Sequence, residues 1–210
     1  MLPPTIPIFP LPNAVLFPNV FLPLHIFEPR YRAMVGEALR GDRIIGMVLL
    51  QPGFEADYER TPPVFPIGCA GVITHAESMP DGRYNIILRG IEKFRIVAED
   101  HSQPYRMAQV DALPEMVAEP DRLTLRQHRQ RLEALLAALV ERSGSDPKFP
   151  PAVADEDLVN ALAQYVQLDP IERQALLERD GVLARCRALV ELLEMKTMTP
   201  RASWKMGSVH

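Results

Sequence analysis

Two residues in this sequence have a spacing that could support acyl transfer. Ser145 and Lys148 form an S-x-x-K string, in which a lysine one helical turn from a serine can act as its base. Pro147 lies between them, inside "SGSDPKFPPA" (143–152), and this stretch of Gly, Ser and Pro predicts a loop. Such a pair needs a rigid helix start, so we interpret the match as chance.

A second pair, His75 and Glu77, lies two residues apart in "GVITHAE" (71–77). Side chains two apart on a β-strand project from the same face, so these two could share a proton or a ligand. A solvated strand face is the more common origin of such a pair, and we favour it. A hydrolase that uses His75 and Glu77 at the mouth of a barrel is the less favoured alternative.

Motifs that define nucleotide, zinc or esterase sites are absent from the sequence. It contains no G-x-x-x-x-G-K-[ST], no G-x-G-x-x-G, no H-E-x-x-H and no G-x-S-x-G. Cys69 and Cys186 have no C-x-x-C neighbour, which favours two reduced, buried thiols in a cytosolic protein. We therefore expect a protein that is not an enzyme and that needs no metal or cofactor.

One basic run remains, "RLTLRQHRQRLE" (122–133), with four arginines and a histidine. It could contact an acidic partner, but a solvated helix face is favoured because a helix in a globular protein needs only one apolar side. The chain as a whole has a formal charge of −4. General nucleic-acid binding needs a positive face, so we expect nucleic acid not to be the partner.

Composition indicates a globular chain, with 47% hydrophobic and 24% charged residues among 210. Its 21 prolines favour β-edges and irregular segments over an all-helical fold. Prolines also interrupt the apolar opening, "IPIFPLPNAVLFPNVFLPLHIFEPRYRAMV" (6–35), which therefore does not read as a signal peptide. No apolar run approaches the roughly 18 residues of a membrane span, and we expect a cytoplasmic protein.

The first part of the chain is expected to be β-rich. Short β-branched runs occur at 44–50, 71–77, 84–90, 93–99 and 105–113, and Asp81-Gly82 between two of them predicts a hairpin. One amphipathic helix is expected from Pro29 to Leu39, with proline in its first turn. Many short strands with irregular connections favour a small barrel or sandwich.

After residue 120 the apolar period changes to that of helices. Asp121 is expected to cap one helix and Asp155 to open the next. Asp169-Pro170 predicts a third helix start, and the last helix is expected from Val182 to Lys196. The tail, 197–210, is short, polar and unpatterned, and we expect it to be disordered.

Three ordered blocks of this sequence resemble the Lon protease N-terminal (substrate-binding) domain family. The opening block is similar to the family's P-L-x-x-x-V-x-F-P-x-x-x-L-P-L pattern at Pro10-Leu11, Val15, Phe17-Pro18 and Leu22-Pro23-Leu24. The block "IGCAGVITHAESMPDGRYNIILRGIEKFRI" matches it at Gly68, Ile73, Asp81, Gly82, Leu88, Gly90 and Phe94, with Lys93 where the family usually has arginine. "LDPIERQALLERDGVLARCRALVELLE" is similar to the helical run that ends the domain.

The resemblance implies an α+β fold. It consists of a β-rich PUA-like pseudo-barrel with one helix over residues 1–115, followed by an α-helical bundle over 120–196. The ATPase and Ser-Lys protease domains that follow in full Lon proteases have no counterpart here, so the chain looks like a stand-alone domain. By this resemblance we expect a non-enzymatic module that binds unfolded or tagged polypeptides, as an adaptor for a separate protease or as a competitor. A PUA-like small-ligand or RNA-binding module is the alternative.

The expected binding surface is the loop "QPGFEADYERTPPVF" (51–65), which is too long for a simple connection. It carries Phe54 and Tyr58 among acidic residues, and exposed rings with a polar rim suit an extended peptide. The alternative is that both rings fold back over the barrel as a lid. The oligomeric state is not predicted.

Overall fold

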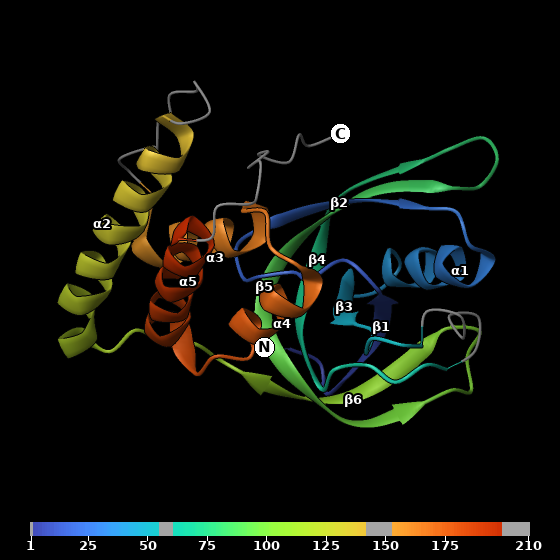
Figure 1. Ribbon diagram of the computed structural model, residues 1–210. Helices are drawn as coiled ribbons and strands as arrows, with labels where there is room; N and C mark the ends of the chain where they lie inside the picture. Colours follow the sequence, from blue (N-terminus) through green and yellow to red (C-terminus); the bar gives the residue numbers. More distant parts are fainter. Residues whose placement is uncertain (1, 55–60, 142–152, 199–210) are drawn as a thin grey trace. The chain divides into compact units, whose positions relative to one another are not determined.

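The computed structural model describes residues 2–54, 61–141 and 153–198, which form a mixed α+β structure of six strands and five helices (Figure 1). The chain divides into two compact units, residues 1–114 and 115–210. The first unit holds all six strands and one helix, and the second holds the other four helices. None of the helices in the described residues has the length and hydropathy needed to cross a bilayer.

The strands of the first unit are β1 (Thr5–Leu11), β2 (Phe21–Ile26), β3 (Ile44–Leu49), β4 (Ile67–Ser78), β5 (Tyr84–Asp100) and β6 (Arg106–Leu113). They form one sheet in the order β2-β5-β4-β3-β1-β6, and a further pairing between β5 and β6 closes five of them into a ring. Only β2 stands outside that ring, paired with the first half of β5. In Figure 1 it runs beside the β4–β5 hairpin and leads into helix α1 (Pro29–Ala38).

The predicted hairpin is confirmed, and its turn includes Asp81 and Gly82. Gly82 donates to the Met79 carbonyl at 2.9 Å, which places Pro80 and Asp81 at the centre of the turn. Gly82 has a positive φ of +79°, whereas Asp81 does not have a positive φ. This is a type I turn followed by a left-handed glycine. The runs 84–90 and 93–99, expected as separate strands, form the single strand β5.

Two prolines within strands, Pro10 of β1 and Pro23 of β2, occupy positions where no ladder N–H is required. Leu50 donates to the Leu11 carbonyl at 3.0 Å, so by alternation the nitrogen of Pro10 points away from β3. Gly90 donates to the Val20 carbonyl at 2.9 Å, so the nitrogen of Pro23 points away from β5. Each proline therefore marks a strand edge that has no partner at that residue.

The first unit has an apolar core inside the closed strands. One cluster of buried side chains joins five strands around the ring of Phe94, which is fully buried: Ile6, Ile8, Val48, Leu50, Val64, Ala70, Phe94, Ala108 and Val110. Helix α1 contributes the predicted face, with Tyr31, Met34, Val35 and Ala38 buried. This packing fixes α1, and with it the end of β2.

Helices of the second unit are α2 (Glu119–Glu141), α3 (Asp155–Tyr165), α4 (Pro170–Leu177) and α5 (Gly181–Met198). The start of α4 is confirmed: the Asp169 backbone N–H donates to the Glu172 carboxylate at 2.8 Å, and Pro170 begins the helix. Helix α2 begins at Glu119, two residues before the expected cap at Asp121. Helix α5 includes Thr197 and Met198, so the expectation of disorder is wrong for these two residues, and 199–210 lies outside the described residues.

A buried arginine organises the start of the second unit. Arg185 on α5 is fully buried and donates to the carboxylate of Glu115 and the side chain of Asn160, each at 2.6 Å, and to the carbonyl of Leu176 at 3.1 Å. These contacts hold α3, α4 and the segment before α2 against one side chain. Because a buried charge without partners is strongly unfavourable, they make one arrangement of these elements preferred.

Candidate functional site

A tight turn at 17–20 starts β2 and presses it against β5. Val20 donates to the Phe17 carbonyl at 3.2 Å, and Asn19, with φ of +60°, takes the left-handed position after Pro18. Gly90 lies beneath the turn, where a Cβ atom would be 2.0 Å from the Phe17 carbonyl oxygen. The close approach explains why a glycine is required at this position of β5.

Side-chain hydrogen bonds then secure β2 on the hairpin. The amide nitrogen of Asn85 donates to Glu77 at 3.2 Å, which leaves its oxygen to accept from Nδ1 of His25 at 2.7 Å. Nε2 of His25 can then accept from Arg83, 3.4 Å away. Arg83 in turn pairs with Asp81 and lowers the pKa of that carboxyl through a side-chain hydrogen bond. The inner edge of β2 is thus occupied by β5.

The other edge of β2 borders an apolar groove of about 280 Å³. Leu24, His25, Ile26 and Phe27 line one wall, and the end of β1 and the start of α1 complete it with Phe9, Leu11, Pro12, Glu28 and Tyr31. The rings of Phe9 and Tyr31 pack at 4.3 Å between centroids. At the rim the Phe27 side chain is 60% exposed and stacks on His25 at 6.2 Å. The arrangement suits apolar side chains of a ligand.

The groove has few charges. Glu28 is its only carboxylate, and it is paired with Arg30 at 2.9 Å. The exposed imidazole of His25 is engaged by Asn85, as described above. A groove that offers no unpaired charge among its lining residues favours an uncharged, apolar ligand segment.

The loop predicted to bind peptide is anchored at both ends. Gln51 donates from its backbone to Pro63 and from its side chain to Val64, at 2.9 and 3.1 Å. Arg106 on β6 donates to the Pro62 carbonyl at 2.8 Å. Between these anchors the Phe54 side chain is 40% exposed. Tyr58 falls within 55–60, outside the described residues.

A second hollow, of about 270 Å³, lies beside this loop anchor and is lined in part by Arg30, Thr61, His101 and Arg106. The guanidinium of Arg106 is occupied by the Glu99 carboxylate and the Pro62 carbonyl. Arg30 binds Glu28 and lies over the Tyr31 ring at 4.6 Å. The arginines here hold the structure together, and the hollow has no excess of positive charge.

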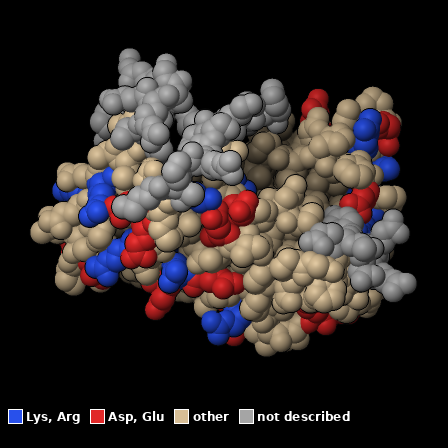
Figure 2. All heavy atoms as spheres, viewed as in Figure 1, with Lys and Arg blue, Asp and Glu red and all other residues tan. Residues whose placement is uncertain are grey.

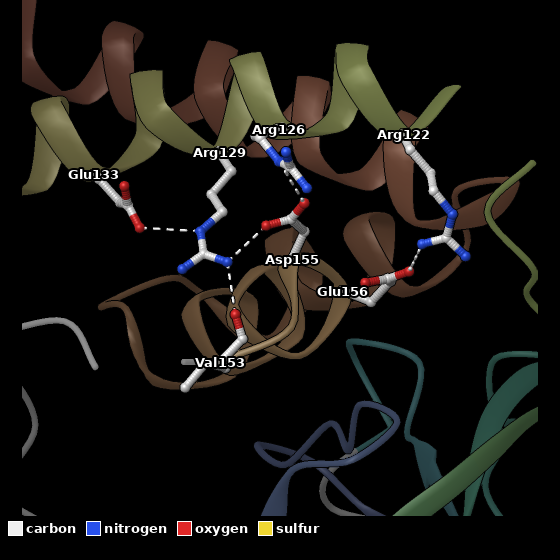
Figure 3. Close-up of polar contacts among 7 residues, drawn as sticks. All are labelled: Arg122, Arg126, Arg129, Glu133, Val153, Asp155 and Glu156. Atoms are coloured by element: carbon white, nitrogen blue, oxygen red, sulfur yellow. Dashed lines mark hydrogen bonds and ion pairs between the residues drawn. The ribbon is translucent and has the colours of Figure 1, made fainter. Parts of the chain in front are cut away.

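The arginines of 122–133 are engaged by carboxylates inside the second unit (Figure 3). Arg129 donates to Asp155 at 2.6 Å, to Glu133 at 3.0 Å and to the Val153 carbonyl at 2.7 Å. Arg122 contacts Glu156, and Arg131 contacts Glu194 on α5. Basic and acidic side chains are accordingly intermingled on the face shown in Figure 2. This pairing supports neither a dedicated acidic partner nor a nucleic-acid surface.

Residues considered for catalysis are not assembled into a site in the described structure. His75 and Glu77 are both exposed, and Glu77 accepts from Asn85. Ser145 and Lys148 lie outside the described residues. No group of three or more His, Cys, Asp or Glu side chains within the described ranges could hold a metal ion. The groove beside β2 was missed from sequence, although its proline-bounded apolar runs were noted.

Comparison with known proteins gives a consistent result over nearly the whole chain. A family model described as the ATP-dependent protease La (LON) substrate-binding domain matches residues 5–195. "Lon protease 2" of Myxococcus xanthus is 27% identical over 99% of this chain, and "Lon protease 2" of Syntrophobacter fumaroxidans is 30% identical over 84%. The chain spans about a quarter of these relatives, 25% and 22% of their lengths.

Solved structures show the same fold. A Lon N-terminal domain protein from Xanthomonas campestris has a TM-score of 0.60 and 22% identity, with 90% of this chain and 97% of that chain covered. The N-terminal domain of a Mycobacterium avium complex Lon protease has a TM-score of 0.64 and 18% identity, with 90% and 98% covered. On the family match over residues 5–195, this chain belongs to the LON substrate-binding domain family.

Proposed function

We propose that this protein is a non-enzymatic binding module for polypeptides and that the groove beside β2 receives the bound chain. The observation that carries the proposal is an apolar groove with the exposed ring of Phe27 at its rim. Aromatic rings bury much area with little loss of side-chain entropy, which suits capture of unfolded segments. Membership of a substrate-binding domain family supports a polypeptide as the ligand.

In protein quality control, such a module would act on unfolded or tagged polypeptides. It would serve either as an adaptor that presents them to a separate protease or as a competitor that retains them. Both roles depend on the same binding step, and only the adaptor role requires a protease in trans. Addition of this protein to a proteolysis assay separates them, because an adaptor raises the rate of cleavage and a competitor lowers it.

Phe54 and Tyr58 are proposed as a second contact for the same ligand. The exposure of Phe54 and the anchoring of its loop at Gln51 and Pro62 support this role. Phe54→Ala combined with Tyr58→Ala should weaken capture of unfolded protein and leave the melting temperature nearly unchanged. A stability loss of about 3–5 kcal/mol with binding retained would instead assign the rings to the core.

The test of the groove uses two exposed apolar residues of the first unit. Labelled α-lactalbumin, reduced and carboxymethylated so that it stays unfolded, is titrated with the protein and followed by fluorescence anisotropy. Phe27→Asp should raise Kd at least about tenfold. Val97→Asp is the matched control, since Val97 is 54% exposed on β5 and lies outside the groove. An equal loss of affinity in both variants, or no binding by the unmodified protein, would contradict the proposal.

A small-ligand or RNA-binding module remains the second candidate, from the PUA-like β region that the family resemblance implies. The formal charge of −4 and the paired arginines weigh against RNA. A labelled RNA titrated in parallel, at two salt concentrations, gives the direct comparison. We also propose that the β-rich unit is a PUA-like pseudo-barrel and that the helices of the second unit form a bundle.

A further inference from the structure

We propose that the bound segment lies in this groove as an added β-strand, hydrogen-bonded to the outer edge of β2. The inference rests on the proposed function and specifies how the backbone of the ligand is recognised. In the described part of the chain β2 pairs with β5 alone, so one of its edges has no strand beside it. A free strand edge is a template for a further strand.

The register of β2 tells which backbone groups face the groove. The Val20 carbonyl accepts from Gly90, so even-numbered residues of β2 direct their N–H and C=O groups to β5. Odd-numbered residues therefore direct theirs to the outer edge. Pro23 presents a carbonyl there without an N–H, and His25 presents both. An incoming strand meets acceptor, donor and acceptor in order.

The groove lies along that edge rather than on one face of the strand. The consecutive β2 residues Leu24, His25 and Ile26 line it, although their side chains alternate between the two faces of the strand. The opposite wall is the end of β1, where Phe9–Leu11 pair only with β3 while Thr5–Ile8 pair with β6. The groove therefore lies between β2 and the end of β1, where Phe9, Leu11 and Pro12 line it.

An extended polypeptide is the occupant that satisfies this arrangement. Groups that alternate along a strand edge match another extended backbone, and the three residues of β2 that line the groove, Leu24 to Ile26, offer about 10 Å of edge. The groove volume of about 280 Å³ is slightly below the roughly 300–1,000 Å³ that is typical of sites for drug-sized ligands. The apolar lining, with its single carboxylate already paired, selects uncharged apolar side chains on the segment that binds.

Backbone N-methylation tests the proposal without altering ligand side chains. The probe is a short fluorescent peptide in which valine and threonine alternate between terminal lysines. Two series carry single N-methyl groups at odd or at even positions. In a given register only the odd or only the even N–H groups of the peptide point to β2. The series that is methylated at those positions should therefore bind at least about tenfold more weakly than the other. Equal affinity of both series would overturn strand addition.

A backbone substitution in the protein gives an independent measurement. His25→Pro removes the N–H that points outward and leaves the ladder bonds to β5 intact, whereas His25→Ala removes only the side chain. His25→Pro should reduce the affinity for the unmethylated peptide at least about fivefold more than His25→Ala does. Far-UV circular dichroism checks that both variants fold. Equal effects of the two substitutions would again overturn strand addition.

The result also separates the two proposals. If the unmethylated peptide and unfolded α-lactalbumin both fail to bind, the proposed function fails. If both bind but N-methylation has no directional effect, the groove captures side chains alone and only the strand model fails.

Discussion

The hydroxyl of Tyr105 donates a hydrogen bond to the Glu37 carboxylate at 2.5 Å and so joins the segment before β6 to α1. Tyr105 is buried, and burial together with the neighbouring carboxylate raises its pKa to about 12. The phenol must stay protonated to keep this bond. Because α1 completes the groove, the contact also stabilises the proposed binding site.

Removal of this hydroxyl should reduce stability in a pH-dependent way. Tyr105→Phe is expected to lose about 1.5–3 kcal/mol near neutral pH, the value of a hydrogen bond to a charged group. The pKa of Tyr105 is raised from 10 to about 12, so the native protein's advantage is complete below pH 10 and is lost between pH 10 and 12. Urea unfolding at pH 8 and pH 11.5 measures this. A difference that stays constant with pH would contradict the assignment.

A methyl group at Gly90 should destabilise the first unit more than one at Gly53. The Cβ of alanine at Gly90 would lie 2.0 Å from the Phe17 carbonyl, so the turn before β2 must shift, at a cost of about 2–3 kcal/mol. Gly53→Ala meets open space and carries only the strain of φ at +89°, about 1 kcal/mol. Thermal unfolding of both variants compares them, and a larger loss at Gly53 would refute the prediction.

The ion pairs between α2 and α3 should differ sharply in their contribution to the free energy of unfolding. The Arg129 side chain is 12% exposed and bonds Asp155 directly, whereas that of Arg126 is 68% exposed and lies 3.8 Å from the same carboxylate. Arg129→Met should cost about 1.5–3 kcal/mol, while Arg126→Met, the matched control, should cost less than about 0.5 kcal/mol. Urea unfolding followed by circular dichroism measures both. Similar losses would mean that α3 is held mainly by its apolar contacts.

Both cysteines should resist thiol reagents in the native protein. Cys69 and Cys186 are buried, and burial, reinforced by Asp155, raises the pKa of Cys186 to about 12. The thiolate is the reactive form, so labelling at pH 8 requires unfolding. An aromatic disulfide reagent should therefore react slowly without urea and rapidly with it. Fast native labelling of Cys186→Ser or Cys69→Ser would locate the accessible thiol and contradict the prediction for it.

Local signals in the sequence predicted several elements correctly. Pro29 and the apolar positions after it predicted α1, Asp169-Pro170 predicted the start of α4, and Asp81-Gly82 predicted the β4–β5 hairpin. Each of these depends on neighbours within one or two turns of chain.

The candidate groove depended on contacts that no local pattern encodes. Whether β2 has one neighbour or two is decided by residues about sixty positions away, since His25 pairs with Asn85. Phe9 and Phe27 both lie in the apolar opening of the sequence, yet Phe9 is buried and Phe27 is exposed at the rim of the groove. By itself the sequence determined the family, the mixed α+β class and the starts of α1, α3 and α4. Tertiary structure alone decided which strand edge stays open, because strand pairing joins distant segments and leaves no periodic mark in either.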